Sequence, residues 1–321
     1  MEHYAAGRFP QRSEFAMQAL ARFILRGRTQ AFASTLVGTL LTFLFPLVNL
    51  GSAVIALITL REGAREGLLQ IAGVGVVLAV FALYLGGSAH AGFLFAGLMW
   101  LPVWLIALHL RRTRSLAGAL ELSGAFGLLP VLLLYVISEG NPDQLWIALM
   151  TSLQEMPDLM PAMSEMLAML AETPLPGWVG QLGMSTVLGI VVSLLLARAL
   201  QAAAVNPGGF REEFHALRLS MPLYWITVVL GVLGIMNGGQ GLFADMLQVV
   251  LTLYFLQGLA VVHGLLGIHG GAAMWLPGLY VLLVLFFTPA MLVLALLGFT
   301  DRWMDFRARA LRKNGKNDQS K

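Results

Sequence analysis

Long apolar runs separated by short polar stretches dominate the chain from residue 29 to residue 299. Several of these runs exceed the roughly 20 residues that an α-helix needs to cross the apolar part of a bilayer. They are continuous, whereas a membrane β-barrel has strands in which apolar and polar residues alternate. Because only helices and closed barrels satisfy their backbone groups in lipid, the pattern predicts an all-α, polytopic transmembrane helix bundle.

The predicted spans follow the apolar runs. Residues 13–28, SEFAMQALARFILRGR, precede them and predict a short amphipathic helix that either lies on anionic lipid or anchors the topology. The runs 29–60 and 272–299 contain Pro46 and Pro289, which predict helix breaks. Together the runs predict about eight full spans plus broken or re-entrant helix pairs near the two prolines. The uninterrupted spans are expected at residues 68–86, 92–110, 116–138, 184–204, 221–236 and 242–266.

The placement of charge predicts the topology. The chain is 58% hydrophobic and 12% charged, and its loop at residues 139–183 carries acidic side chains but not one Lys or Arg. Since basic residues stay in the cytoplasm, this loop is expected on the non-cytoplasmic side of the membrane and both termini on the cytoplasmic side. Three parts follow: a cytoplasmic amphipathic segment at 1–28, a transmembrane helical domain at 29–300 and a basic cytoplasmic tail at 301–321.

The last apolar run raises a question of parity. Counted from a cytoplasmic N-terminus, residue 267 is already cytoplasmic, so one more crossing would leave the basic tail outside. A helix that breaks near Pro289 and turns back would return the tail to the cytoplasm. The alternative is a single tilted helix over residues 272–299 and a different number of spans before it; we prefer the broken helix.

Polar side chains inside the predicted spans are the candidate site, because such groups must face protein or water. At about 100° per residue, Asp245, Gln248, Thr252 and His263 share one face of the last uninterrupted span, and Gln257 points elsewhere. The stripe either lines a substrate cavity or forms hydrogen bonds between helices. The candidate binding residues are Asn49, Glu121, Asp245, Gln248, Thr252, Gln257 and His263.

Two of these candidates have a second interpretation. Glu121 is either a proton-relay or cation-site acid, or an interfacial acid close to Arg111, Arg112 and Arg114. Asn49 either offers its amide to a ligand or caps the bend that follows the first helix.

No catalytic motif is present. The chain has no HExxH, phosphate-binding loop or nucleophile elbow, and it has no Cys. We therefore predict no enzyme, no catalytic residue, no metal site, no cofactor and no nucleic-acid partner. The expected partners are the lipid bilayer, a small-molecule solute and a cytoplasmic protein. The candidate contact residues for that protein are Arg211, Arg218, Asp301, Arg302, Asp305 and Arg307.

Several stretches carry a family resemblance: ALARFILRGRTQA, ALITLREGAREGL, FREEFHALRLS, LYFLQGLAVVHGLLG and LLGFTDRWMDFRARALRK. They look like the YybS-like family of bacterial multi-spanning membrane proteins, a domain of unknown function. That family is distantly similar to the S-components of energy-coupling-factor transporters and to the cell-shape protein MreD. The resemblance implies an inner-membrane protein and assigns no residue a role. The acidic loop at 139–183 departs from a compact S-component.

Two functions fit these observations. A solute-binding transport component would have an internal cavity lined by the candidate binding residues. A membrane scaffold or assembly protein would have a packed bundle in which the same residues hydrogen-bond to one another, and its cytoplasmic surface would contact a protein partner.

Overall fold

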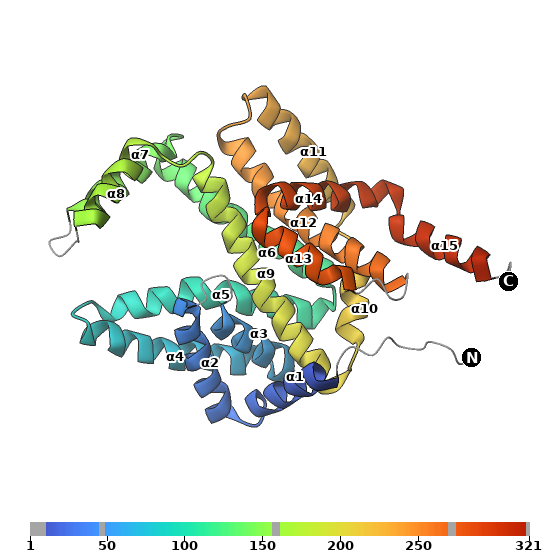
Figure 1. Cartoon of the computed structure of the whole chain (residues 1–321). Coiled ribbons are helices and arrows are strands. Elements are labelled where there is room, and N and C mark those ends of the chain that lie inside the picture. The colour runs from blue at the N-terminus through green and yellow to red at the C-terminus, as the bar shows by residue number, and fades with distance from the viewer. Residues whose placement is uncertain (1–10, 45–48, 156–160, 269–273, 319–321) are drawn as a thin grey trace. The chain divides into compact units, whose positions relative to one another are not determined.

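The computed structural model describes residues 11–44, 49–155, 161–268 and 274–318, and these residues form helices without a strand. The prediction of an all-α fold is confirmed. The helices, in chain order (Figure 1), are α1 (Gln11–Ile24), α2 (Arg28–Leu44), α3 (Leu50–Glu62), α4 (Ala64–Tyr84), α5 (Ala89–Thr113), α6 (Leu116–Ile137), α7 (Pro142–Gln154), α8 (Pro161–Glu172), α9 (Trp178–Val205), α10 (Gly209–His215), α11 (Met221–Met236), α12 (Leu242–Ile268), α13 (Trp275–Leu285), α14 (Phe287–Met304) and α15 (Phe306–Asp318).

Five of the described helices are long and apolar enough to cross a membrane: α4, α5, α6, α9 and α12. The chain is therefore a membrane protein with several candidate spans, but the prediction of about eight full spans is not confirmed. Helices α11 and α13 are apolar but shorter. At 1.5 Å per residue the 16 residues of α11 cover about 24 Å, less than the roughly 30 Å of a bilayer's apolar layer.

Both proline-containing runs divide into two helices. The first forms α2 and α3, and Pro46 lies outside the described residues. The second forms α13 and α14, which are separated by Phe286 with φ −132° and ψ 53°. Pro289 lies in the first turn of α14, where its missing N–H has no helical partner to lose. The predicted break near Pro289 is thus present, a few residues before the proline itself.

The chain forms two compact units, which are described separately. The first unit contains residues 1–123, 188–220 and 253–321, and the second contains residues 124–187 and 221–252. Helices α6, α9 and α12 contribute to both units. The expected division at residues 28 and 300 concerns the sides of the membrane and stays a prediction.

Helix α3 is the centre of one part of the first unit. Its residues 51–60 are all buried, and α2, α4 and α5 pack around it. The core beside it contains the buried side chains of Ile55, Val74 and Trp100. Arg111 of α5 donates to the carbonyl oxygens of Thr59 and Leu60, each at 3.1 Å, and so gives partners to the end of the helix. A short buried helix is stable here because neighbouring elements satisfy its last carbonyl groups.

Helices α12 and α14 of the first unit cross in direct backbone contact. A Cβ atom on Gly258 would lie 1.9 Å from the carbonyl oxygen of Leu294, and one on Gly298 would lie 2.1 Å from that of Tyr254. The ring of Tyr254 packs edge-on against Phe299 beside this crossing, with centroids 5.2 Å apart. Small residues that allow backbones to approach are typical of helix contacts in membranes.

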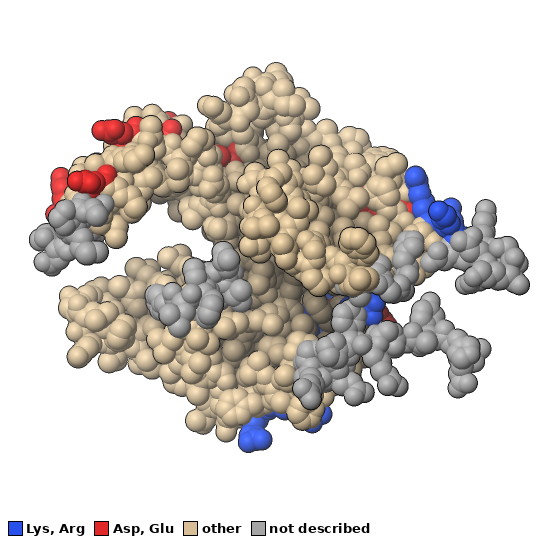
Figure 2. Space-filling model, in the orientation of Figure 1, with Lys and Arg blue, Asp and Glu red and all other residues tan. Residues whose placement is uncertain are grey.

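The second unit contains α7 and α8, which pack against each other and carry acidic side chains on their surface (Figure 2). Trp146 of α7 donates from Nε1 to the carbonyl oxygen of Leu170 at 2.7 Å. Its ring lies 5.3 Å from that of Trp178, whose Nε1 donates to Asp143 at 3.2 Å. The predicted acidic loop therefore folds as a helical pair held by two indole rings.

We expect Gly258→Ala to destabilise the first unit. The added methyl group collides with the α14 backbone, and overpacking of this kind costs about 1–3 kcal/mol. Unfolding of the detergent-solubilised protein by a denaturing detergent measures the change. Gly189→Ala in α9 is the matched control, because nothing lies within 4 Å of its added methyl group. Equal losses in the two variants would contradict the close contact.

Candidate functional site

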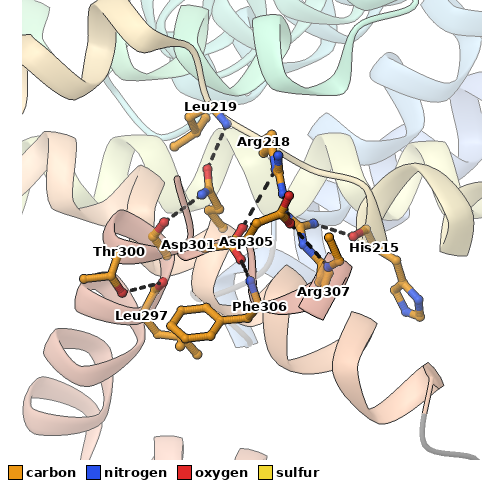
Figure 3. A network of polar contacts seen from close by, with 12 residues as sticks. His215, Arg218, Leu219, Leu297, Thr300, Asp301, Asp305, Phe306 and Arg307 are labelled. Carbon is orange, nitrogen blue, oxygen red and sulfur yellow. Dashed lines mark hydrogen bonds and ion pairs between the residues drawn. The ribbon is translucent and has the colours of Figure 1, made fainter. Parts of the chain in front are cut away.

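Residues 216–220, ALRLS, connect α10 to α11 and are called the connector below. Two of them, Leu217 and Leu219, are each 2% exposed. Backbone groups that are buried outside helices need hydrogen-bond partners from elsewhere in the fold. Polar side chains at the connector include those of Arg218, Asp301, Asp305 and Arg307 (Figure 3).

Gln257 joins the connector to two helices. It is 1% exposed; its Oε1 accepts a hydrogen bond from the Leu219 N–H at 2.8 Å, and its Nε2 donates to the Gly298 carbonyl oxygen at 2.7 Å. One amide of α12 thus bonds both the connector and α14. These hydrogen bonds join separate elements, but both partners of Gln257 are backbone groups and neither belongs to another candidate residue.

Glu121 of α6 accepts a hydrogen bond from the next residue of the connector, Ser220. Its Oε1 accepts a hydrogen bond from the Ser220 N–H at 2.6 Å. Ser220 is the last residue of the connector, so the carboxylate gives its final N–H group a partner. Its partner in the structure is therefore a backbone N–H group. The sequence predicted either a proton-relay or cation-site acid or an interfacial acid near basic residues, and neither prediction included this partner.

Asp301 and Arg307 form a buried ion pair beside the connector. Asp301 is fully buried and Arg307 is 9% exposed; Arg307 Nη2 donates to Asp301 Oδ2 at 2.7 Å. Arg307 also donates to the carbonyl oxygen of His215, the last residue of α10. Arg218 of the connector pairs with Asp305 (Figure 3). Loss of one partner of such a buried pair leaves an uncompensated charge, which is strongly destabilising.

The turn between α14 and α15 sets the spacing of these acids. Asp305 adopts a left-handed conformation with φ 44°, which Asp tolerates better than most residues. Its N–H donates to the Asp301 carbonyl oxygen, and its Oδ1 accepts from the Ala308 N–H at 3.3 Å as the N-cap of α15. Burial raises the pKa of Asp305, but the hydrogen bonds from Arg218 and Ala308 outweigh it and hold this pKa below its usual value.

His263 lies in an aromatic group next to the connector. Its Nδ1 is 2.8 Å from the Leu259 carbonyl oxygen and therefore carries the proton. Its Nε2 then accepts from the Tyr280 hydroxyl group at 3.1 Å. The rings of Phe214 and His215 lie 5.7 and 6.5 Å from the His263 ring. Both polar ends of this imidazole are thus occupied by protein groups.

The imidazole of His215 is held in its neutral form. Burial, as the larger cause, and the positive charges of Arg211 and Arg307 together lower its pKa to about 4. The carbonyl oxygen of His215 accepts a hydrogen bond from Arg307. The imidazole is the part of the residue that gains a proton when the pH falls.

The second unit holds the other part of the predicted stripe. Asp245 is 5% exposed, and its Oδ2 accepts from the Tyr135 hydroxyl group at 2.7 Å. Gly180 allows close approach to both Asp245 and Gln248, because a Cβ there would lie 2.8 and 2.5 Å from their oxygens. Thr252 donates within its own helix to the Gln248 carbonyl oxygen. Tyr135 was not predicted, since a single Tyr in an apolar span gives no signal of its partner.

Asn49 lies at the start of α3. Its Oδ1 accepts from the Ser52 N–H at 3.0 Å, which is the capping role proposed as its second interpretation. Its carbonyl oxygen accepts from the Ser193 hydroxyl group at 3.1 Å. Of the predicted partner-contact residues, Asp301 and Arg307 lie inside the network, whereas Arg211 is exposed.

Across the described residues, no group of three or more His, Cys, Asp or Glu side chains is arranged to hold a metal ion.

We expect acidification to destabilise the first unit through His215. Because its pKa is about 4 when folded and about 6.5 when unfolded, the unfolded chain binds a proton that the folded chain does not between these values. The free energy of unfolding should fall as the pH is lowered from about 7 to 4. His215→Gln should flatten this part of the profile, and unfolding at a series of pH values measures it. His90→Gln, at an exposed position, is the control, and an unchanged slope in the His215 variant would contradict the assignment.

No protein-family model, no curated protein and no solved structure matches this chain. The function must therefore be inferred from the geometry of its own residues.

Proposed function

We propose that the protein is a multi-pass scaffold or assembly protein of the bacterial inner membrane that contacts a cytoplasmic protein. In this proposal it transports no solute and catalyses no reaction. The candidate spans support its place in a bilayer. The resemblance to the YybS-like family is part of the proposal and supports the inner membrane as its location.

The observation that carries the proposal is the pairing of Gln257. A solute site needs donors and acceptors that remain available to the ligand, whereas both ends of this buried amide are bonded to backbone groups. Glu121 and His263 are also engaged with groups of the same unit. Such bonding to groups of the same protein is what a packed bundle requires of its polar residues.

The network also fixes the surface that a partner would meet. The pair of Asp301 and Arg307 holds the start of α15 against the end of α10. Beyond this point α15 exposes the basic side chains of Arg309, Arg312 and Lys313, together with Leu311, which is 57% exposed. Basic side chains gather on the visible surface in the region of α15 (Figures 1 and 2). In this proposal, α15 contacts an acidic surface of a cytoplasmic protein.

The break at Phe286 supports a cytoplasmic position for that surface. If α13 and α14 enter the bilayer and return, the basic residues of α15 stay on the side of the membrane where basic residues are enriched. In this proposal the last apolar run adds no net crossing of the membrane.

We expect Gln257→Leu to reduce stability and the amount of folded protein. The variant leaves the Leu219 N–H and the Gly298 carbonyl group without their partner, and each such group costs about 1–3 kcal/mol. Thr252→Val is the control, because it removes one bond within a single helix. Fluorescence-detected size exclusion and detergent unfolding measure both variants. A stable Gln257→Leu protein that has lost function in cells would instead favour a solute site.

We expect charge reversal on α15 to abolish the contact with the partner. A photo-crosslinking residue at position 311 should link to one protein in native membranes, and Arg309→Glu, Arg312→Glu and Lys313→Glu together should remove that product. Substitution of the same three positions by the other basic residue keeps the charge and should keep the product. Crosslinks to lipid alone, or a product insensitive to reversal, would contradict the proposal.

A further inference from the structure

The first unit contains a cavity of about 450 Å³ that the sequence did not indicate. The corner between α1 and α2 forms one side of it, and α3 and α4 form the other. Its polar lining consists of Arg28, Glu62, Glu66 and Gln70, and Ile24 and Ile58 are part of its apolar lining. The volume is within the range of small-molecule sites.

The polar lining has acceptors without partners. Arg28 makes a paired contact with Glu66, from Nε and Nη2, at 2.8 and 2.6 Å. Gln70 is 6% exposed and donates from Nε2 to the Arg28 carbonyl oxygen at 3.4 Å. Its Oε1 is buried and accepts from no described residue. The exposed carboxylate of Glu62 likewise has no partner among the residues that the structure describes.

The chemistry of the lining favours a ligand with N–H donors and positive charge. One guanidinium faces two carboxylates, so the lining has one negative charge in excess. An unpartnered buried amide oxygen loses the energy of a hydrogen bond unless a donor reaches it. None of the described residues that line the cavity is aromatic, whereas quaternary ammonium groups are held by aromatic rings. A primary ammonium group satisfies these conditions and a trimethylammonium group does not.

The position of the cavity along α4 indicates where this ammonium comes from. Glu66 lies in the first turn of α4, a helix long enough to cross the membrane. The next side chains, Leu68 and Leu69, are 46% and 47% exposed, as expected of a surface that meets lipid. The polar end of the cavity therefore lies at the depth of lipid headgroups.

We propose that this cavity binds the headgroup of a phosphoethanolamine lipid. The ammonium group donates to Glu62 and, after a small shift of its side chain, to Gln70 Oε1. The phosphate lies next to Arg28, whose Nη1 is not used by Glu66. The site uses no residue of the polar network around the connector, so the failure of either proposal leaves the other standing.

Native mass spectrometry of the full chain, purified in detergent and supplied with defined lipids, tests the proposal. The probes are phosphatidylethanolamine and phosphatidylcholine with identical acyl chains, which differ only in the N-methyl groups. We expect about tenfold preference for phosphatidylethanolamine, the effect of one charge-assisted hydrogen bond. Equal occupancy by the two lipids would overturn the proposal.

Variants assign the preference to the cavity. Glu62→Gln changes an exposed side chain, keeps the fold and should remove most of the preference. Glu62→Lys should shift the preference towards phosphatidylglycerol. Gln70→Leu should weaken phosphatidylethanolamine binding as well. Glu172→Gln in α8 is the matched control and should keep the preference, since its carboxylate is exposed outside the cavity. Loss of preference in this control, or retention in the Glu62 variants, would overturn the assignment.

A competition experiment with a soluble amine tests whether the cavity binds a lipid or a free amine. Free phosphoethanolamine carries the same headgroup chemistry without acyl chains, so we expect it to compete only at concentrations far above those of the lipid. Displacement of the lipid by equimolar phosphoethanolamine would assign the cavity to a soluble amine and overturn its role as a lipid site.

Discussion

The structure depends on one constraint: a polar group that is removed from water needs a partner within the protein. The connector makes this constraint visible, because Leu217 and Leu219 are buried although they lie outside the helices. Its N–H groups are bonded by Gln257 and Glu121, which come from helices far away in the sequence. The first turn of α15 is held in a similar way. The Asp301 carboxylate accepts from the Phe306 N–H group and from the Arg307 guanidinium. Gln257 and Glu121 are therefore explained first as partners of the backbone.

The apolar contacts obey a related constraint, since lipid chains are as apolar as the side chains of the helices. Association must come from close packing and from hydrogen bonds between helices. At the crossing of α12 and α14, Gly258 and Gly298 bring the two backbones into contact. The Gly298 carbonyl group is also the acceptor of Gln257, so packing and hydrogen bonding reinforce each other at this crossing.

The apolar runs predicted the helices well, because continuous hydrophobicity over 20 residues has few structural solutions. The same runs could not tell how many helices cross the bilayer: α11 and α13 are apolar but short, and hydropathy contains no information on depth. Spacing placed Gln257 away from the stripe of Asp245 but could not identify Leu219 and Gly298 as its partners. Asp301 and Arg307 were assigned to an exposed tail because charge near a terminus usually means solvent, and their mutual burial depends on a turn that the pattern does not encode.

The polar network around the connector and the cavity beside α4 differ in how many of their donors and acceptors have protein partners. This difference bears on function. Around the connector, both ends of the Gln257 amide and both nitrogens of His263 have protein partners, so these groups gain nothing from a ligand. In the cavity beside α4, Gln70 Oε1 and Glu62 keep acceptors that no described residue fills. A site that binds must retain such capacity until the ligand arrives, whereas a site that holds a fold must use it during folding. This physical difference is the basis of the two proposals, in which the network holds the fold and the cavity binds a ligand.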